Sequence, residues 1–160
     1  MNAIDLLTRQ HRQMEKELEA ARDAPPAAQR ELVQALGDTL MAHVLSEETL
    51  FYPAVNAKRT EDVLMESLEE HLSLKRLLAD LLELKTSDAH FAPKLQVLKE
   101  QTEHHHEEEE EKLFPKAAKV LDAGELDALG GLMEAEQALL LEKEPRKLAA
   151  RQTSKAAELG

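Results

Sequence analysis

Histidines and glutamates recur at metal-binding spacing in this chain, which has seven histidines, 32 acidic residues and no cysteine. Four separate segments each carry one such histidine, and in two of them a glutamate four residues later continues the same row; the set is His11, His43, Glu47, His71, His105 and Glu109. Imidazole nitrogens and carboxylate oxygens are ligands for iron, zinc and manganese ions. The lack of cysteine excludes disulfides, thiolate zinc sites and cysteine-ligated iron–sulfur clusters. Any metal must therefore bind through nitrogen and oxygen.

Each of these histidines lies on the apolar stripe of a segment with helical periodicity. The first stripe runs through Ile4, Leu7, His11, Met14 and Leu18, in the steps of three and four that mark one helix face. The same spacing predicts that the other three histidines and both glutamates also point inward. Burying a carboxylate without a partner costs several kcal/mol, and a buried imidazole needs hydrogen bonds or a changed protonation state. A metal cluster satisfies both groups together, and a metal-free buried polar network is the alternative.

An internal repeat fixes the register of the run 104–106, which consists of three histidines. Residues 43–53 and 105–115 both read His-x-x-x-Glu-Glu-x-x-apolar-aromatic-Pro. His105 precedes Pro115 by the same ten residues that separate His43 from Pro53, so we expect His105 to point inward. His104 and His106 then become residues behind the ligands or on the surface. A rotation of the helix by one residue would instead bring His106 and Glu110 inward.

The composition and the breakers predict the elements that must position these residues. Apolar residues make up 42% of the chain, aromatic residues only 2%, and there are five glycines and six prolines, a usage that favours helices over strands. Breakers leave helical segments at about 4–22, 27–54, 61–84 and 93–121, with connections short enough for antiparallel neighbours. We therefore expect an all-α, up-down-up-down four-helix bundle over residues 1–121. An accessory C-terminal helix is expected over 122–143, opened by a capping box at Asp122 and Glu125, followed by a frayed tail over 144–160.

Over residues 4–120 the sequence resembles the hemerythrin-like family, also called HHE cation-binding domains. The resemblance rests on the early His11, the mid-chain His71 and the two His-x-x-x-Glu repeats with their aromatic-Pro ends. It implies an oxo-bridged pair of iron ions, with zinc or manganese as possible substitutes, held by terminal imidazoles from His11, His43, His71 and His105. Glu47 and Glu109 would bridge the two ions, and Glu48 and Glu110 would hydrogen-bond to ligand imidazoles or face solvent.

One departure from the family pattern is Lys75, which stands where oxygen-carrying hemerythrins have a fifth histidine. Because a protonated lysine is a poor iron ligand, one metal would keep an additional open or water-filled position. Glu15, four residues after His11, would supply a substitute ligand or face solvent. Tyr52 and Phe114 are expected to close the end of the bundle, and His90 is expected on the surface.

The same features predict a class of function. A net charge of −12 argues against nucleic-acid binding, and no apolar run is long enough for a membrane span, so we expect a cytoplasmic protein. The first hypothesis is a di-iron protein that binds or senses dioxygen, nitric oxide or the iron or redox state. Alternatives are a di-iron enzyme that oxidises ferrous iron or decomposes peroxide, with Lys75 as proton donor, and a metal-free helical adaptor.

Overall fold

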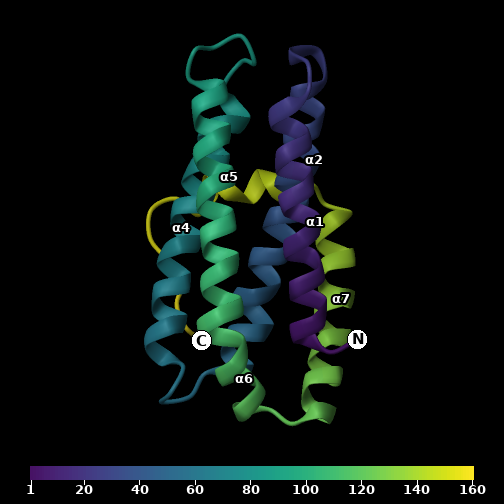
Figure 1. Cartoon of the computed structure of the whole chain (residues 1–160), viewed down its shortest axis with the longest axis vertical. Helices are drawn as coiled ribbons and strands as arrows, with labels where there is room; N and C mark the ends of the chain where they lie inside the picture. The colour runs from purple at the N-terminus through teal and green to yellow at the C-terminus, as the bar shows by residue number, and fades with distance from the viewer.

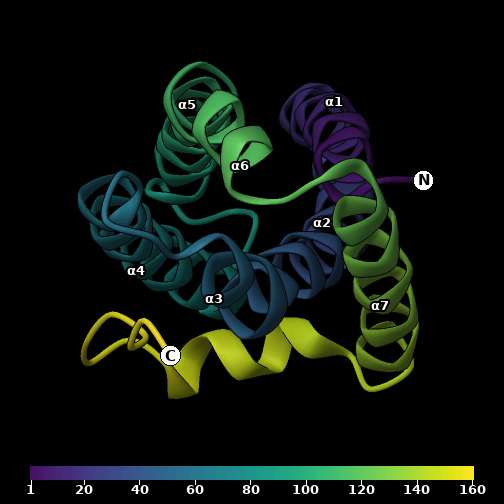
Figure 2. The same cartoon turned by 90° about the horizontal axis from the view of Figure 1, so that it is seen from below.

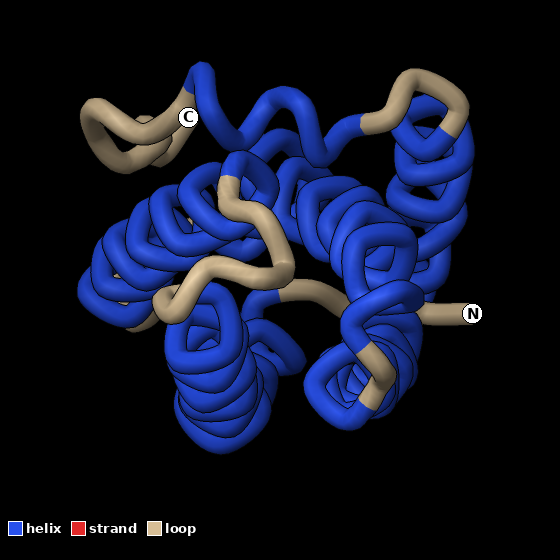
Figure 3. The backbone as a smooth tube through the Cα atoms, turned by 90° about the horizontal axis from the view of Figure 1, so that it is seen from above, coloured by secondary structure: helices blue, strands red, loops and turns tan.

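The computed structural model describes all 160 residues and contains helices joined by short loops, without strands (Figure 3). Four rods run side by side along the long axis (Figure 1). The first is α1 (Ala3–Asp23) and the third is α4 (Glu61–Glu83). The second and fourth are composite, each a long helix, a π-helical turn and a short helix: α2 (Pro26–Ser46), η1 (Glu47–Phe51) and α3 (Tyr52–Val55), then α5 (Phe91–Glu108), η2 (Glu109–Leu113) and α6 (Phe114–Val120). The prediction of an all-α, up-down-up-down bundle is confirmed.

Local signals in the sequence set the helix ends. The Asn2 side chain accepts a hydrogen bond from the backbone N–H of Asp5 at 2.9 Å and caps α1. Pro26 occupies the first turn of α2, where its missing N–H costs nothing. The capping box of Asp122 and Glu125 is present in both directions at the start of α7 (Ala123–Leu141).

The two π-helical turns precede the two prolines of the internal repeat. Proline has no N–H, and its ring clashes with the carbonyl four residues earlier, so an ordinary α-helix cannot continue through it. In η1 the N–H of Tyr52 instead bonds to the carbonyl of Glu47, and in η2 the N–H of Phe114 bonds to that of Glu109. This i→i+5 spacing places each aromatic residue one turn beyond its glutamate on the same inward face.

The core consists of two apolar clusters with a polar layer between them. One cluster contains Met14, Leu40, Leu74 and Leu98 among its sixteen buried residues. The other holds fourteen, among them Leu7, Phe51, Leu68 and Leu113. In every rod the inward histidine falls in sequence between a residue of one cluster and a residue of the other. Since each fully buried large apolar side chain contributes roughly 1.5–3 kcal/mol, the two clusters hold the rods in register around that layer.

The C-terminal part packs on the outside of the bundle. α7 lies against α1 and α2, and the following 3₁₀ helix η3 (Pro145–Arg151) crosses α2 and α4 (Figure 2). The segment 144–160 differs from the frayed tail that we expected: Ala149 is fully buried, and Arg76 donates to the carbonyls of Thr153 and Ser154. Its Lys, Ala and Gln content gave no sign of these partners. None of the helices combines the length and the apolar character that a bilayer crossing needs.

Candidate metal centre

The six residues predicted as ligands converge in the polar layer between the apolar clusters. Each is at most 2% exposed, and together they form what we call the buried centre: His11 from α1, His43 from α2, Glu47 from η1, His71 from α4, His105 from α5 and Glu109 from η2. They fall into two groups of possible ligands that share both glutamates. We call the group of His11 and His43 the first position and the group of His71 and His105 the second position.

Each glutamate faces one histidine of either position. Glu47 Oε1 lies 3.3 Å from His43 Nε2 and 3.2 Å from His71 Nε2. Glu109 Oε1 lies 3.2 Å from His11 Nε2 and 3.5 Å from His105 Nε2. Ligand atoms about 2.1 Å from one cation and at right angles to each other stand about 3 Å apart, so these spacings fit neighbouring ligands. Both carboxylates therefore lie between the two positions.

Several inward-facing atoms of the centre lack hydrogen-bond partners, whereas Nε2 of His71 and Nε2 of His105 lie 3.1 Å from each other. Seven buried side-chain atoms of the whole protein are unpartnered, and five of them belong here: His11 Nε2, His43 Nε2, Glu47 Oε1, Glu47 Oε2 and Glu109 Oε1. An unsatisfied buried polar atom costs about 1–3 kcal/mol, and native proteins rarely gather several of them. A cation binds where lone pairs converge and no hydrogen-bond donor faces them. The residues present therefore fit a metal pair.

The outer nitrogens of the same imidazoles are all engaged. Nδ1 of His71 is 2.9 Å from a Glu48 oxygen, and Nδ1 of His11 is 2.8 Å from a Glu110 oxygen. His43 and His105 follow the same rule: His43 Nδ1 lies 2.9 Å from Gln10 Oε1, and His105 Nδ1 lies 2.8 Å from Glu70 Oε1. Because each acceptor holds the imidazole proton on Nδ1, the Nε2 lone pair faces the centre.

Without cations, the centre can carry only part of its negative charge. Burial, together with the charge of Glu109, raises the pKa of Glu47 well above its usual value. For Glu109, burial acts upward, but the nearby His105 and His11 outweigh it and leave its pKa well below the usual value. Burial lowers the pKa of His11, whereas the nearby carboxylates of Glu109 and Glu110 raise it more, to about 9. The pKa shifts of Glu47 and His11 both act to reduce the net negative charge of the centre.

Tyr52 enters the centre, contrary to the expectation that it only closes the bundle end. Its fully buried hydroxyl donates to Glu109 Oε2 at 2.7 Å and lies 3.1 Å from His71 Nε2. The equivalent residue of the second repeat, Phe114, instead stacks on His11, with ring centroids 5.7 Å apart. Sequence reasoning missed Tyr52 because it assumed α-helical spacing after Glu47; the aromatic-Pro signature of the π-helical turn was the available signal.

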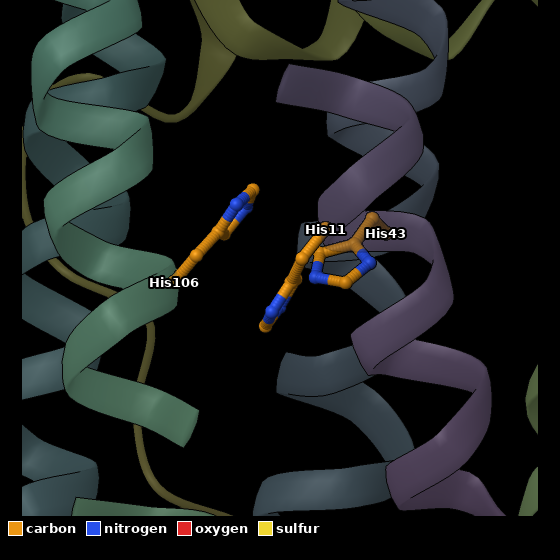
Figure 4. Close-up of side chains that lie close together, drawn as sticks. All are labelled: His11, His43 and His106. Carbon is orange, nitrogen blue, oxygen red and sulfur yellow. The ribbon is translucent and has the colours of Figure 1, made fainter. Parts of the chain in front are cut away.

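Of the two places expected for His106, behind the ligands or on the surface, the structure excludes the surface. His106 is 1% exposed and reaches from α5 toward α1, where its ring lies parallel to that of His11 at 3.8 Å and 7° (Figure 4). Because α5 packs between α4 and α1, His105 and His106 face different neighbours. His106, His11 and His43 have nitrogens close enough to form a third possible ligand group. However, the lone pairs of stacked rings lie in parallel planes, so in this arrangement His106 and His11 cannot both point at one cation.

The remaining polar residues near the centre have other partners. Lys75 is nearly buried and bonds to Glu48 Oε1 at 2.9 Å, so it supports the carboxylate behind His71 and does not enter the centre. Glu15 lies 3.3 Å from His106 Nδ1 and belongs to neither ligand position. His90 and His104 are exposed.

Comparisons with known proteins agree with this geometry. The model of the hemerythrin HHE cation-binding domain matches residues 2–117. A crystal structure of a hemerythrin HHE cation-binding domain-containing protein from Mycobacterium kansasii is similar over 99% of this chain and 98% of that chain, with a TM-score of 0.81 and 25% sequence identity. That similarity includes α7 and the C-terminal segment, which lie outside the family model. Curated protein sequences give no significant match. The chain belongs to the hemerythrin HHE cation-binding domain family.

Proposed function

We propose that the protein is a non-haem di-iron protein of hemerythrin type that binds or senses a small ligand such as dioxygen or nitric oxide. The observation that carries this proposal is the set of five unpartnered inward-facing atoms, on four residues, at the shared carboxylates. His11 and His43 would hold one ion and His71 and His105 the other, with Glu47 and Glu109 shared. Two iron ions would supply redox-active binding of a diatomic ligand. Zinc and manganese suit the same nitrogen and oxygen donors.

The surroundings favour small ligands over larger substrates. The two apolar clusters enclose the centre above and below and exclude bulk water from it. A pocket of about 100 Å³ between α1, α2 and α7 has His43 and Gln10 in its lining. Since a water molecule occupies about 30 Å³ in the liquid, such a pocket admits a diatomic molecule or peroxide and little more.

Tyr52 is a further candidate ligand of the second position. Burial and the charges of Glu109 and Glu47 raise the pKa of this phenol well above its usual value when no cation is present. A cation beside the phenolic oxygen would lower the pKa of Tyr52, because positive charge favours the phenolate. The phenolate would give the second position a fifth protein ligand and fill the place that Lys75 leaves free.

The test is the metal content and visible spectrum of the protein purified without chelators. Two iron ions per chain are expected, with absorption from ligand-to-iron charge transfer. His43→Ala and His105→Ala should each lose at least one ion, whereas the surface control His90→Ala should keep both. Equal metal content in all three variants would contradict the ligand assignment.

A second candidate is an enzyme that decomposes peroxide, and the position of Tyr52 is the observation that favours it. We expected Lys75 to donate a proton to peroxide, but Lys75 is paired with Glu48, whereas the Tyr52 hydroxyl lies in the centre. A protonated Tyr52 would donate a hydrogen bond to a peroxide substrate. Catalytic oxygen evolution from peroxide by the iron-loaded protein would support the enzyme, and spectral changes that reverse on removal of dioxygen or nitric oxide would support the binding protein.

A further inference from the structure

Apart from the difference between Tyr52 and Phe114, the internal repeat gives the two positions similar surroundings. Behind His71 stands Glu48, paired with Lys75 at 2.9 Å. Behind His11 stands Glu110, paired with Arg12. Each position thus has one carboxylate whose charge is balanced by one cationic side chain. These two ion pairs therefore cause no difference in charge between the two positions.

The two positions differ in the residue that hydrogen-bonds to their other histidine, which is His43 in the first position and His105 in the second. Gln10 and Glu70 are equivalent residues, because each directly precedes the histidine of its own helix, His11 or His71. His43 is held by the neutral amide oxygen of Gln10 at 2.9 Å, whereas His105 is held by the carboxylate of Glu70 at 2.8 Å. A carboxylate behind an imidazole raises its basicity and its strength as a metal ligand more than an amide does. Among the groups that hydrogen-bond to the four ligand imidazoles, those of the second position therefore carry one more negative charge.

The amide behind His43 is held in place by the C-terminal helix. Gln137 of α7 accepts from Gln10 Nε2 at 2.6 Å and donates back to Gln10 Oε1 at 3.1 Å. It also donates to Ser46 Oγ at 2.8 Å. The Gln10 oxygen is thereby kept toward His43. Gln10, His43 and Gln137 also line one small pocket, which lies beside the first position.

We propose that the two cation positions are not equivalent: the first position releases and exchanges its cation, the second retains its cation, and the Gln10/Glu70 difference sets this order. The inference rests on the proposed function, since it needs two bound cations. Gln10 and Glu70 are positioning residues that act through His43 and His105. The direct consequence is that exchanging the two residues exchanges the behaviour of the positions.

The experiment is anaerobic release of ferrous iron from the fully loaded protein to a chromogenic chelator. The native protein should release its iron in two phases of equal amplitude. Gln10→Glu should slow the fast phase, and Glu70→Gln should accelerate the slow phase, each by about 10-fold to 100-fold, the usual effect of residues behind metal ligands on affinity. In the double variant two phases should return, but with the positions exchanged. Anomalous scattering from crystals of half-emptied protein identifies the position that keeps its ion.

Two matched controls separate this effect from surface charge. Ala20→Glu adds the same charge on α1 and Glu69→Gln removes the same charge from α4, both at exposed positions; neither should change either phase. Two ions per chain before chelation, followed by release in one phase or by release rates that Gln10→Glu and Glu70→Gln leave unchanged, would overturn the inference and leave the proposed function standing. Fewer than two ions in the native protein would instead contradict the proposed function.

Discussion

Replacing Tyr52 by phenylalanine removes one hydroxyl from the centre and tests the geometry around it. That hydroxyl is fully buried and donates to Glu109 at 2.7 Å, and a hydrogen bond to a charged group contributes about 1.5–3 kcal/mol. For a chain of this size, such a loss lowers the melting temperature of the metal-free protein by roughly 3–12 °C. Calorimetry of the metal-free protein measures this change. An unchanged melting temperature would refute the hydrogen bond.

The same substitution has a spectroscopic consequence in the iron-loaded protein. If Tyr52 ligates the second position, the Tyr52→Phe variant loses the phenolate-to-iron absorption while it keeps both ions. Phe114 stands at the equivalent place beside the first position and stacks on His11 as Tyr52 stacks on His71. Adding Phe114→Tyr to the Tyr52→Phe variant should restore a phenolate band at the other ion. A native spectrum in Tyr52→Phe alone would refute the assignment of Tyr52 as a ligand.

Three further predictions concern stability. The pKa of His11 rises from 6.5 to about 9 in the metal-free fold. Protonation of His11 therefore stabilises that fold by about 3 kcal/mol at and below pH 6.5, and this contribution is lost as the pH rises through 9. Urea unfolding that shows no loss of stability across this pH range would contradict the prediction. Gly130→Ala should destabilise by about 1–3 kcal/mol, because a Cβ there collides with the backbone of residues 1–3; the control Gly131→Ala, which meets nothing, should not. Lys75→Met leaves the carboxylate of Glu48 buried without its lysine partner and should lower the free energy of unfolding by about 3–5 kcal/mol. Lys75→Met combined with Glu48→Gln should lower it less. Equal losses in urea unfolding of the two variants would refute the ion pair.

The helices and the inward residues were predictable because their pattern is periodic. An apolar stripe with steps of three and four depends only on local geometry, so the sequence alone predicts the four helices and the inward positions of His71 and Glu109. The segment after residue 144 has no such pattern. Its packing depends on single contacts, such as those from Arg76 to Thr153 and Ser154, which no local rule contains.

The parts of the centre that the sequence did not predict depend on departures from the regular α-helix or on contacts between helices. Tyr52 turns inward only because a π-helical turn adds a residue before Pro53. His106 is buried because α5 lies between α1 and α4, so two adjacent residues can both face inward. Gln10 acts on a histidine of another helix, a pairing that needs the bundle geometry and cannot be read from one segment.

An anomalous difference map, measured at the iron absorption edge from crystals of protein purified without chelators, tests the proposed metal pair most directly. Two peaks are expected on either side of the shared glutamates Glu47 and Glu109, one beside His11 and His43 and the other beside His71 and His105. A map with no peak in the bundle interior, with a single peak, or with peaks only at surface carboxylates would contradict it.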